Sequence, residues 1–538
     1  MTASFDHIVV GAGSSGAALA GRLSDAGARV LVLEAGGPPR GPYFRIPAAL
    51  MKLWFDPKVT WSYATQPEPG LNGRSLPAPR GRVLGGSSAI NGMVCNRGSA
   101  WDYDQWAALG LDGWSFAEVL PYFRRLEANW RGESALHGAD GPVPVSAFPG
   151  TANTPLVAEA ARGMGFDLTE DFAGPRPEGF GVPDVSTRRG RRVTSADAYM
   201  GGHRPTLTIA TGARVLRVLV EGRRAVGVEY LQEGQVRTAR TDGEVILCGG
   251  VFNSPQLLML SGLGPADELN RHGIAPLLDL PGVGRDLEDQ PAARFMMAAR
   301  EPLSLTRELR FDRFAASALR WLVKGDGFLA GPPAMGFFIV RTQPGLPAPD
   351  MRMIVSPPMD SRIWFPGVRA PAAPGVSVGF SLCYPRSRGA VTLASADPLA
   401  APRIQLNIYD DPHDLAEMRR GYRLMRDLLR QPALSPYLQQ MVMPPAEPHA
   451  DDEIDAYLRA ATATTFHPVG SCRMGTGSGA VVDAAMRVRG VEGLRVVDTS
   501  IFPTQIGGNP HLPAVMLAEK AADLILGRPA PAPVELPR

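Results

Sequence analysis

The sequence predicts an α/β fold, α+β overall, in which a Rossmann-like dinucleotide-binding domain is joined to a second, more antiparallel domain. Residues 5–37 show the order strand, glycine-rich turn, helix and second strand, which is typical of the start of a doubly wound sheet. At 538 residues the chain is too long for one compact core, so two packed domains are expected. Between residues 290 and 463, short strands alternate with Pro-rich loops, a pattern that indicates a separate domain.

The first turn has the GxGxxG spacing, because Gly11, Gly13 and Gly16 appear in the segment GAGSSG directly after the apolar run IVV. In this pattern the first glycine permits the tight turn, the second lets the backbone approach a pyrophosphate, and the third lets the helix pack against the strand. Ser14 and Ser15 stand at the start of the following helix, where free backbone N–H groups and the helix dipole favour a phosphate.

The second strand, from Val30 to Leu33, ends at Glu34. A carboxylate at this place can accept hydrogen bonds from a ribose 2′-OH and would repel a 2′-phosphate. An ordinary turn with a surface Glu is the alternative, because glycine-rich turns occur by chance in a chain with 60 Gly. The agreement of strand, glycines, helix, second strand and acid favours a dinucleotide without a 2′-phosphate. The choice between NAD and FAD stays open at this point.

Composition and charge exclude several classes of protein. A hydrophobic content of 45% and a charged content of 20% are typical of a globular protein, and the net charge of +2 without a basic run argues against nucleic acid as a partner. We find no secretory signal and no apolar stretch long enough to span a membrane, so a cytoplasmic protein is expected. The cysteines are far apart and form no CxxC pair, which argues against a disulfide framework or a metal site; they are Cys95, Cys248, Cys383 and Cys472.

A second glycine-rich stretch, GRVLGGSSAINGMVCNRG, occupies residues 81–98. Its glycines and small side chains would let the backbone approach a planar or phosphorylated ligand closely. Further strands are expected within 207–230, 244–249, 351–355 and 376–383, and helical stretches at 101–126 and 512–526.

Several of these motifs together resemble the glucose-methanol-choline (GMC) family of FAD-dependent oxidoreductases, nearly from end to end. The residues that carry the resemblance are GAGSSG with Glu34, the 81–98 stretch, GGVFNSPQLLMLSGLG, HPVGSCRMG and LRVVDTSIFPT. The resemblance implies FAD rather than NAD. It also implies a discontinuous FAD-binding domain made of residues 1–150, 205–289 and 464–538. The remaining residues, 151–204 and 290–463, would form a substrate-binding domain with a large antiparallel sheet flanked by helices.

The resemblance assigns cofactor-binding residues position by position. The positions that match the family's FAD site are Gly11, Gly13, Ser14, Ser15, Gly16, Glu34 and Ala35 for the ADP half, Val83, Gly86 and Ser88 in the second glycine-rich stretch, Asn91, Gly92, Met93 and Val94 along the flavin ring, Val215 beside adenine, Asp498 beside the ribityl and pyrophosphate groups, and Asn509. Relatives with a covalently linked flavin carry His at the position of Ile90. FAD is therefore expected to be non-covalent.

Two histidines are candidates for the catalytic base. Removing hydride from an alcohol carbon requires the hydroxyl proton to leave as well, and imidazole is the usual base near neutral pH. His467 and His511 both stand where irregular backbone meets the last elements of the predicted FAD-binding domain. The family motif has a paired His–His or His–Asn, and the resemblance assigns His511 as the second member. Because choline-type relatives carry Asn there, this assignment counts against choline as the substrate.

The expected reaction is the oxidation of a primary alcohol to an aldehyde, with hydride transfer to flavin N5 and electrons passed to O2 or another acceptor. Framework segments such as LHGADGPVPV and NPHLPAVMLAEK are most similar to bacterial alcohol oxidases and dehydrogenases, including the hydroxymethylfurfural oxidase and choline dehydrogenase branches. Phe466, Trp364 and Phe365 are candidate pocket residues, and they would suit an apolar or aromatic alcohol if they are not ordinary packing residues.

Two other reactions occur on the same fold and stay open as alternatives. Hydroxynitrile-lyase-like relatives keep FAD without redox turnover, and light-driven decarboxylases lack the catalytic pair, so His467 and His511 count against the latter. No GxSxG segment suggests a hydrolase. The expected partners are a small alcohol and an electron acceptor, and the chain is expected to be a monomer or a homodimer. Neither the alcohol nor the choice between oxidase and dehydrogenase follows from the sequence.

Overall fold

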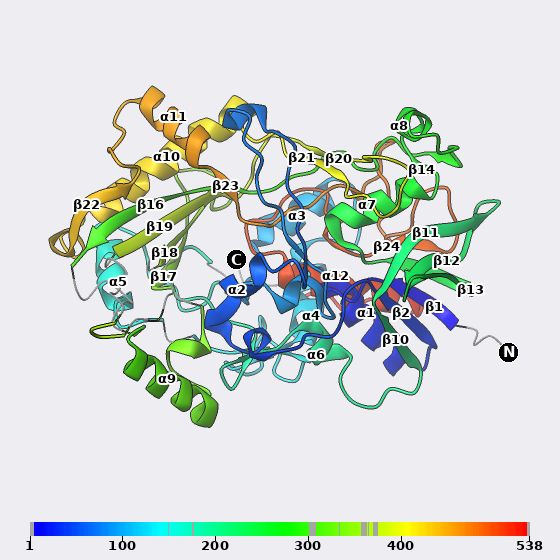
Figure 1. Ribbon diagram of the computed structural model, residues 1–538, viewed down its shortest axis with the longest axis horizontal. Helices are drawn as coiled ribbons and strands as arrows, with labels where there is room; N and C mark the ends of the chain where they lie inside the picture. The colour runs from blue at the N-terminus through cyan, green and yellow to red at the C-terminus, as the bar shows by residue number, and fades with distance from the viewer. Residues whose placement is uncertain are drawn as a thin grey trace.

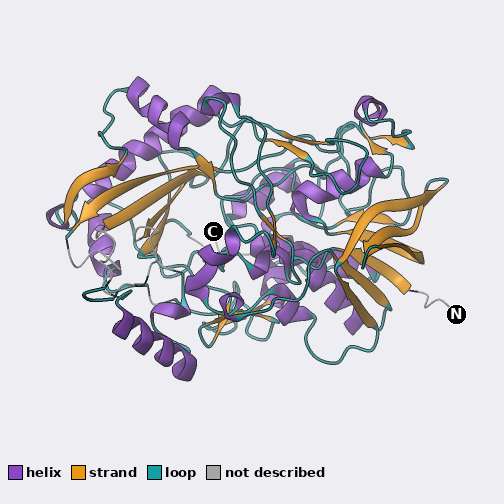
Figure 2. Ribbon diagram, viewed as in Figure 1, coloured by secondary structure: helices purple, strands orange, loops and turns teal. Residues whose placement is uncertain are grey.

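The structure is a computed structural model, and it describes residues 5–148, 150–174, 177–300, 308–332, 334–356, 363, 365–368 and 375–534. Two seven-stranded sheets organise these residues. Figure 1 shows the first sheet on the right, close to the N-terminus, and the second sheet on the left. Figure 2 shows that loops and helices fill the region between the two sheets. The predicted α/β fold with a second antiparallel domain is confirmed.

The first sheet has the strand order β10-β2-β1-β13-β12-β11, with β24 added beside β13. Its strands are β1 (Phe5–Val10), β2 (Val30–Glu34), β10 (Leu207–Thr211), β11 (Ala213–Glu221), β12 (Arg224–Gln232), β13 (Gln235–Leu247) and β24 (Leu494–Val496). Strands β10, β2, β1, β13 and β24 pair in parallel, whereas β11, β12 and the first half of β13 form an antiparallel meander. Strand β24 arrives from the other end of the chain, so the sheet is assembled from distant segments.

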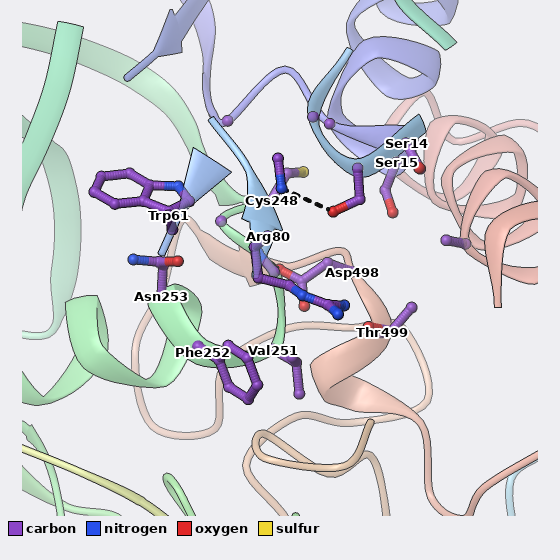
Figure 3. Close-up of a pocket in the computed structure, with 18 of the residues that line it drawn as sticks. Ser14, Ser15, Trp61, Arg80, Cys248, Val251, Phe252, Asn253, Asp498 and Thr499 are labelled. Carbon is purple, nitrogen blue, oxygen red and sulfur yellow. Dashed lines mark hydrogen bonds between the residues drawn. The ribbon is translucent and has the colours of Figure 1, made fainter. Parts of the chain in front are cut away.

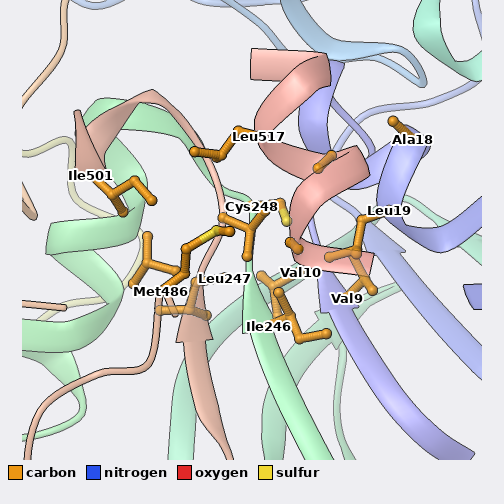
Figure 4. Packing of buried hydrophobic residues seen from close by; sticks show 14 of the residues in the cluster. Val9, Val10, Ala18, Leu19, Ile246, Leu247, Cys248, Met486, Ile501 and Leu517 are labelled. Atoms are coloured by element: carbon orange, nitrogen blue, oxygen red, sulfur yellow. The ribbon is translucent and has the colours of Figure 1, made fainter. Parts of the chain in front are cut away.

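The central parallel strands are apolar and buried on both faces. All five residues of β2 are buried, and Ile8, Val9 and Val10 of β1 are buried as well, the continuous pattern expected of parallel strands. Helix α1 (Ser14–Asp25) packs against α12 (His511–Ile525) and α6 (Ser195–Tyr199). Figure 4 shows Val9 and Ile246 of the sheet close to Leu19 of α1.

The helical stretch predicted at 101–126 is two helices, α3 (Ala100–Ala108) and α4 (Phe116–Leu126). Gly110 and Gly113, with φ of 83° and 84°, lie between them in left-handed conformations that end a helix. Each helix begins with a capping box, formed by Ser99 with Asp102 and by Ser115 with Glu118. The prediction of one continuous stretch was therefore wrong at these turn residues.

The second sheet is antiparallel throughout and has the order β22-β16-β19-β18-β17-β7, with β23 beside β16. Its strands are β7 (Gly179–Gly181), β16 (Pro291–Ala299), β17 (Gly336–Val340), β18 (Met351–Ser356), β19 (Gly375–Leu382), β22 (Leu438–Met443) and β23 (Ala463–Thr464). Its core contains Phe295, Phe338 and Phe380, all fully buried. Helices α10 (Pro412–Leu429) and α11 (Asp451–Ala461) pack together beside this sheet.

The remaining elements are short or peripheral. They are α2 (Leu50–Trp54), α5 (Thr154–Gly163), α7 (Gly250–Leu260), α8 (Ala266–Arg271), α9 (Phe311–Lys324), β3 (Thr60–Trp61), β4 (Arg80–Gly81), β5 (Glu127–Asn129), β6 (Val143–Val145), β8 (Thr187–Arg188), β9 (Arg191–Arg192), β14 (Leu263–Gly264), β15 (Leu278–Asp279), β20 (Ala390–Thr392) and β21 (Arg403–Gln405). The exact residue limits of the two domains stay a prediction. Among the described residues, no helix is both long and apolar enough to cross a membrane, and no cluster of side chains could hold a metal ion.

Candidate active site

One cavity lies beyond the carboxyl ends of β1 and β2 and reaches toward the second sheet. It is lined by both glycine-rich stretches and by the first residues of α1 and α7. The loop after β23, the segment after β24 and the residues before α12 complete the lining. Figure 3 shows the labelled side chains of Ser14, Arg80 and Asp498 around it. Of the predicted site residues, those that line it are Gly11, Gly13, Ser14, Ser15, Glu34, Ala35, Gly86, Asn91, Gly92, Met93, Val94, Val215, Phe466, His467, Asp498, Asn509 and His511.

The two glycine-rich stretches touch each other at this cavity. A Cβ on Gly86 would lie 2.6 Å from the Cα of Gly13, so position 86 cannot carry a bulkier residue without a shift of one loop. Gly11 has φ of 99°, and a Cβ on it would lie 2.5 Å from the carbonyl oxygen of Cys248. Gly16 does not line the cavity, because it packs the start of α1 onto the turn, where a Cβ would lie 2.0 Å from the oxygen of Gly11.

The N-terminus of α1 opens onto the cavity without a side-chain cap, since Gly13 occupies the N-cap position. The backbone N–H groups of the first turn and the positive end of the helix dipole are thus available to an anion. The side chain of Ser14 lies beside this turn, where its Oγ is 3.1 Å from His511 Nδ1. The arrangement fits a pyrophosphate at this place.

Glu34 is buried at the end of β2 and holds two turns together. Its Oε2 accepts a hydrogen bond from Ala12 N (2.9 Å) and its Oε1 from Gly36 N (2.8 Å). Burial raises the pKa of this carboxyl group, while the two backbone donors and Arg82 act in the opposite direction. Each oxygen keeps a second lone pair, so the carboxylate can accept from a ligand hydroxyl in addition to the two turns.

The second glycine-rich stretch presents backbone rather than side chains to the cavity. Asn91 Oδ1 accepts from Met93 N (3.1 Å) and from Arg192 Nη1 (2.8 Å). Two predicted ligands, Val83 and Ser88, are buried and do not line the cavity. Ser88 Oγ donates to Gly85 O (2.5 Å) and accepts from Ser195 N (3.0 Å), so this side chain shapes the loop. Val83, Ser88 and Gly16 therefore do not line the cavity themselves, and Gly16 has the packing role that its place in the GxGxxG motif predicts.

Asp498 lies at the start of α7, although it belongs to the segment after β24. Its carboxylate accepts from Gly250 N (2.9 Å), Ser254 Oγ (2.6 Å) and Ser500 N (2.9 Å). Burial raises the pKa of the carboxyl group, and the three donors lower it. Asp498 therefore ties the start of α7 to the segment after β24 at the cavity wall.

His467 lines the cavity in a turn where Phe466 has a positive φ of 62°. Its backbone N donates to Asp289 Oδ1 (3.0 Å). Its ring Nδ1 is 2.9 Å from Gln290 Oε1, and its Nε2 is 3.1 Å from Asn509 Nδ2. Both ring nitrogens thus have defined partners.

The hydrogen-bond network determines the tautomer of His467. Gln290 Nε2 donates to the carbonyl oxygens of Cys383 (3.1 Å) and Ile506 (2.9 Å), so its Oε1 must accept from His467 Nδ1–H. Asn509 Oδ1 accepts from Asn96 Nδ2 (3.0 Å) and Arg352 Nη1 (3.1 Å). Its Nδ2 therefore donates to His467 Nε2, which carries the lone pair.

Burial lowers the pKa of His467 well below its ordinary value of 6.5, and the positive charges of Arg352 and Arg80 lower it further. The imidazole is consequently neutral at neutral pH. A neutral imidazole with its lone pair on the cavity side can accept a proton from a bound hydroxyl group.

His511 and His467 both line the cavity without a hydrogen bond between them, so their pairing stays a prediction. As the first residue of α12, His511 is directed to the first turn of α1, where its Nδ1 meets Ser14 Oγ at 3.1 Å. Burial lowers its pKa to about 4, with a further contribution from Arg192. Asn509 precedes the helix, and its Nδ2 is the group that contacts His467 Nε2.

Phe365, one of the predicted pocket residues, is not at this site. Phe365 is 38% exposed and stacks on Phe311 with ring centroids 4.8 Å apart, and it does not line the cavity. Trp364 lies outside the described residues. Phe466 does line the cavity, with Trp54 at an edge-to-face distance of 5.7 Å.

Gln290, Arg352, Asn96 and Thr465 were missed by sequence reasoning. Asn96 belongs to the second glycine-rich stretch and Thr465 is two residues from His467, so both were near quoted motifs. Gln290 directly precedes β16, and Arg352 lies in β18. The sequence there shows only ordinary strand patterns.

A dinucleotide site on a Rossmann-like sheet that ends at a neutral, oriented histidine defines an oxidoreductase. The GMC oxidoreductase family profile matches residues 5–292 and 385–518. Oxygen-dependent choline dehydrogenases from Rhizobium rhizogenes and Paraburkholderia xenovorans are 41% and 43% identical over 535 and 544 residues. The two alignments cover 97% and 99% of this chain and 96% of each relative.

Solved structures give the same result. Pyridoxine 4-oxidase from Mesorbium loti is 29% identical with a TM-score of 0.87, covering 96% of this chain and 98% of the other. Formate oxidase from Aspergillus oryzae is 27% identical with a TM-score of 0.90, covering 98% of each chain. The chain belongs to the GMC oxidoreductase family. It is an enzyme that acts on CH–OH donors, and FAD is the cofactor typical of its family.

Proposed function

We propose that the protein oxidises a primary alcohol to the aldehyde with non-covalently bound FAD, with His467 as the base and Asn509 as its partner, and passes the electrons to O2 or another acceptor. The observation that carries this proposal is the neutral His467, whose Nε2 lone pair lies 3.1 Å from Asn509 Nδ2 at the cavity wall. The names of the choline dehydrogenase and pyridoxine 4-oxidase relatives support an alcohol as the substrate.

The residues of the cavity fit FAD. The uncapped start of α1 and the close approach of Gly86 to Gly13 suit the pyrophosphate, and the lone pairs of Glu34 suit a ribose. The backbone from Asn91 to Val94 would lie along the flavin ring. FAD supplies the hydride acceptor when it is bound. Ile90, which lines the cavity, is an aliphatic residue that cannot form a covalent bond to the ring.

The side chains around His467 would bind and deprotonate the alcohol. One N–H of Asn509 Nδ2 donates to His467 Nε2, and the other is available for the substrate oxygen. Because Nε2 has a single lone pair, the substrate hydroxyl group must displace the Asn509 N–H from it before giving its proton to Nε2 as the carbon loses hydride. The displaced N–H can then donate to the substrate oxygen. Gln290 Oε1, which accepts from Nδ1–H, then stabilises the imidazolium that forms.

A choline dehydrogenase is the second candidate within the same class. The objection raised by His511 remains, because choline-type relatives carry Asn at the position of His511 and Asn509 is a different position. A lyase reaction stays an alternative, since it would use the same cavity without net reduction of the cofactor.

Anaerobic mixing with a series of primary alcohols tests the proposal. Loss of the oxidised flavin absorbance, with formation of one aldehyde per flavin, is the expected result. Reoxidation by O2 and by an artificial acceptor then separates oxidase from dehydrogenase. A flavin that stays oxidised with every alcohol, while a cyanohydrin is cleaved, would contradict the proposal in favour of the lyase.

A further inference from the structure

Two buried arginines flank the catalytic pair. Arg352 on β18 is only 8% exposed. Its Nη1 donates to Asn509 Oδ1 (3.1 Å), and its Nη2 donates to Gln290 Oε1 (3.3 Å) and lies 3.3 Å from His467 Nδ1. The positive charge of Arg352 is thus in contact with both His467 and Asn509.

Arg80 on β4 lines the cavity itself. Its Nη2 donates to Phe466 O (3.0 Å) and its Nε to Pro79 O (2.7 Å). Figure 3 shows its guanidinium group reaching into the cavity. Neither Arg80 nor Arg352 forms an ion pair with any carboxylate in the described part of the chain.

The carboxylate of Asp289 offsets only part of the positive charge of Arg80 and Arg352. It lies close enough to interact electrostatically with Arg80 and Arg352, but its Oδ1 is engaged by the backbone N of His467 and of Gln290. Burial raises its pKa to about 6. Of the described residues that line the cavity, only Glu34 and Asp498 are acidic, and both are hydrogen-bonded to turns away from His467.

We infer that this positive environment excludes cationic alcohols, so that the substrate is a neutral or anionic alcohol rather than a quaternary ammonium alcohol such as choline. The inference rests on the proposed function, because it concerns the alcohol held by His467 and Asn509. In a small substrate the charged group lies only a few bonds from the hydroxyl group. A trimethylammonium group would lose its hydration near two like charges and could not form a hydrogen bond in return.

This substrate class differs from the one in the names of the homologues, which are oxygen-dependent choline dehydrogenases at 41% to 43% identity. Overall identity of this size reports the shared fold and cofactor site. Two side chains beside the catalytic pair are enough to change whether the site accepts neutral, anionic or cationic small alcohols.

Matched pairs of alcohols test the inference with the wild-type enzyme. The first pair is choline and its neutral isostere 3,3-dimethylbutan-1-ol; the second is benzyl alcohol and its para-trimethylammonium derivative. In anaerobic mixing, the second-order rate constant of flavin reduction should be at least about tenfold higher for the neutral member of a pair, equivalent to about 1.4 kcal/mol. A cation that reduces the flavin as fast as its neutral partner would overturn the inference.

Two variants of Arg352 show whether this charge is responsible. Arg352→Gln removes the charge, and Arg352→Lys keeps it while losing the bidentate geometry. Absolute rates should fall in both, because Asn509 loses a hydrogen bond. The choline-to-isostere ratio should rise about tenfold in Arg352→Gln and stay at the wild-type value in Arg352→Lys. Equal ratios in both variants would assign Arg352 a structural role only and overturn the charge argument.

The outcomes separate this inference from the proposed function. Reduction by neither member of either pair, nor by any other alcohol, contradicts the proposed function. Reduction by choline as efficient as by 3,3-dimethylbutan-1-ol leaves the alcohol oxidation standing and refutes the exclusion of cations. If a variant fails to retain flavin, the wild-type pairs still decide.

Discussion

At the residue scale, the site depends on the pair that His467 forms with Asn509. Asn509 is fixed by Asn96 and Arg352, and Gln290 is fixed by two backbone carbonyls. These contacts give His467 one tautomer and leave Nε2 as the base. The same residue types in the sequence carry no such information, because an Asn or Gln side chain can be turned either way.

Replacing His467 by Ala should slow flavin reduction by a saturating alcohol about a hundredfold to ten-thousandfold, the usual range for losing a general base. Asn509→Ala should also slow reduction, because it removes the amide beside the hydroxyl group. His511→Ala is the matched control, and it should change the rate much less, since His511 contacts Ser14. Rapid anaerobic mixing measures all three. A larger effect of His511→Ala than of Asn509→Ala would support the His–His pair.

The pH dependence of flavin reduction should follow the lowered pKa of His467. The base must be neutral, and burial with Arg352 and Arg80 holds its pKa well below 6.5. The rate should therefore stay constant as the pH falls through 6.5 and decline only at more acidic values. In Arg352→Gln the decline should begin at a higher pH, because a nearby positive charge is gone. An unchanged profile in this variant would mean that the charge does not act on His467.

Glu34→Ala should weaken FAD binding. The change removes the acceptor for Ala12 N and Gly36 N as well as the proposed ribose contact, and we expect a loss of about 1.5 to 3 kcal/mol. Flavin retained after gel filtration, measured by absorbance per protein, checks this. Wild-type retention would show that the carboxylate contributes to the turns but not to the ligand.

At the element scale, the two glycine-rich stretches work as one unit because they approach so closely. Gly86→Ala would place a Cβ 2.6 Å from Gly13 Cα in a residue with φ of 52°, so one loop must move. We expect a loss of stability of about 2 kcal/mol together with weaker flavin binding. Gly477→Ala is the control, since a Cβ on Gly477 meets nothing within 4 Å and Gly477 does not line the cavity. Thermal unfolding and flavin retention should separate the two variants; equal behaviour would show that the loops are not constrained by each other.

At the scale of the whole molecule, the cavity joins two hydrophobic cores. The first core surrounds the parallel sheet, and the second surrounds the antiparallel sheet. Residues from both ends of the chain line the space between them. A ligand that fills this space should therefore stabilise the molecule as a whole.

Acid precipitation should release all of the flavin into the supernatant, because Ile90 offers no atom for a covalent link. The apoprotein should unfold at a lower temperature than the holoprotein, and added FAD should restore the higher value; at a free FAD concentration a hundred times Kd the gain is about 2.7 kcal/mol. Flavin that remains with the precipitated protein would refute the non-covalent assignment.

The sequence by itself determined the parts of this protein that depend on local pattern. The GxGxxG spacing, the apolar run before it and Glu34 after the second strand predict the dinucleotide half, because each feature is confined to a few neighbouring residues. The break at Gly110 and Gly113 was visible in principle, since both are glycines between two capping boxes. The position of His467 followed from its motif.

Only the tertiary structure decided which side chains meet across long separations in the chain. Asn509 and His511 are two residues apart, and the start of α12 at His511 directs one to His467 and the other to Ser14. Gln290, just before β16, and Arg352, in β18, reach the pair from different parts of the second sheet, and no local pattern marks them. Charge around a buried site depends on such contacts, which is why the positive environment of the catalytic pair could be recognised only once the chain was folded.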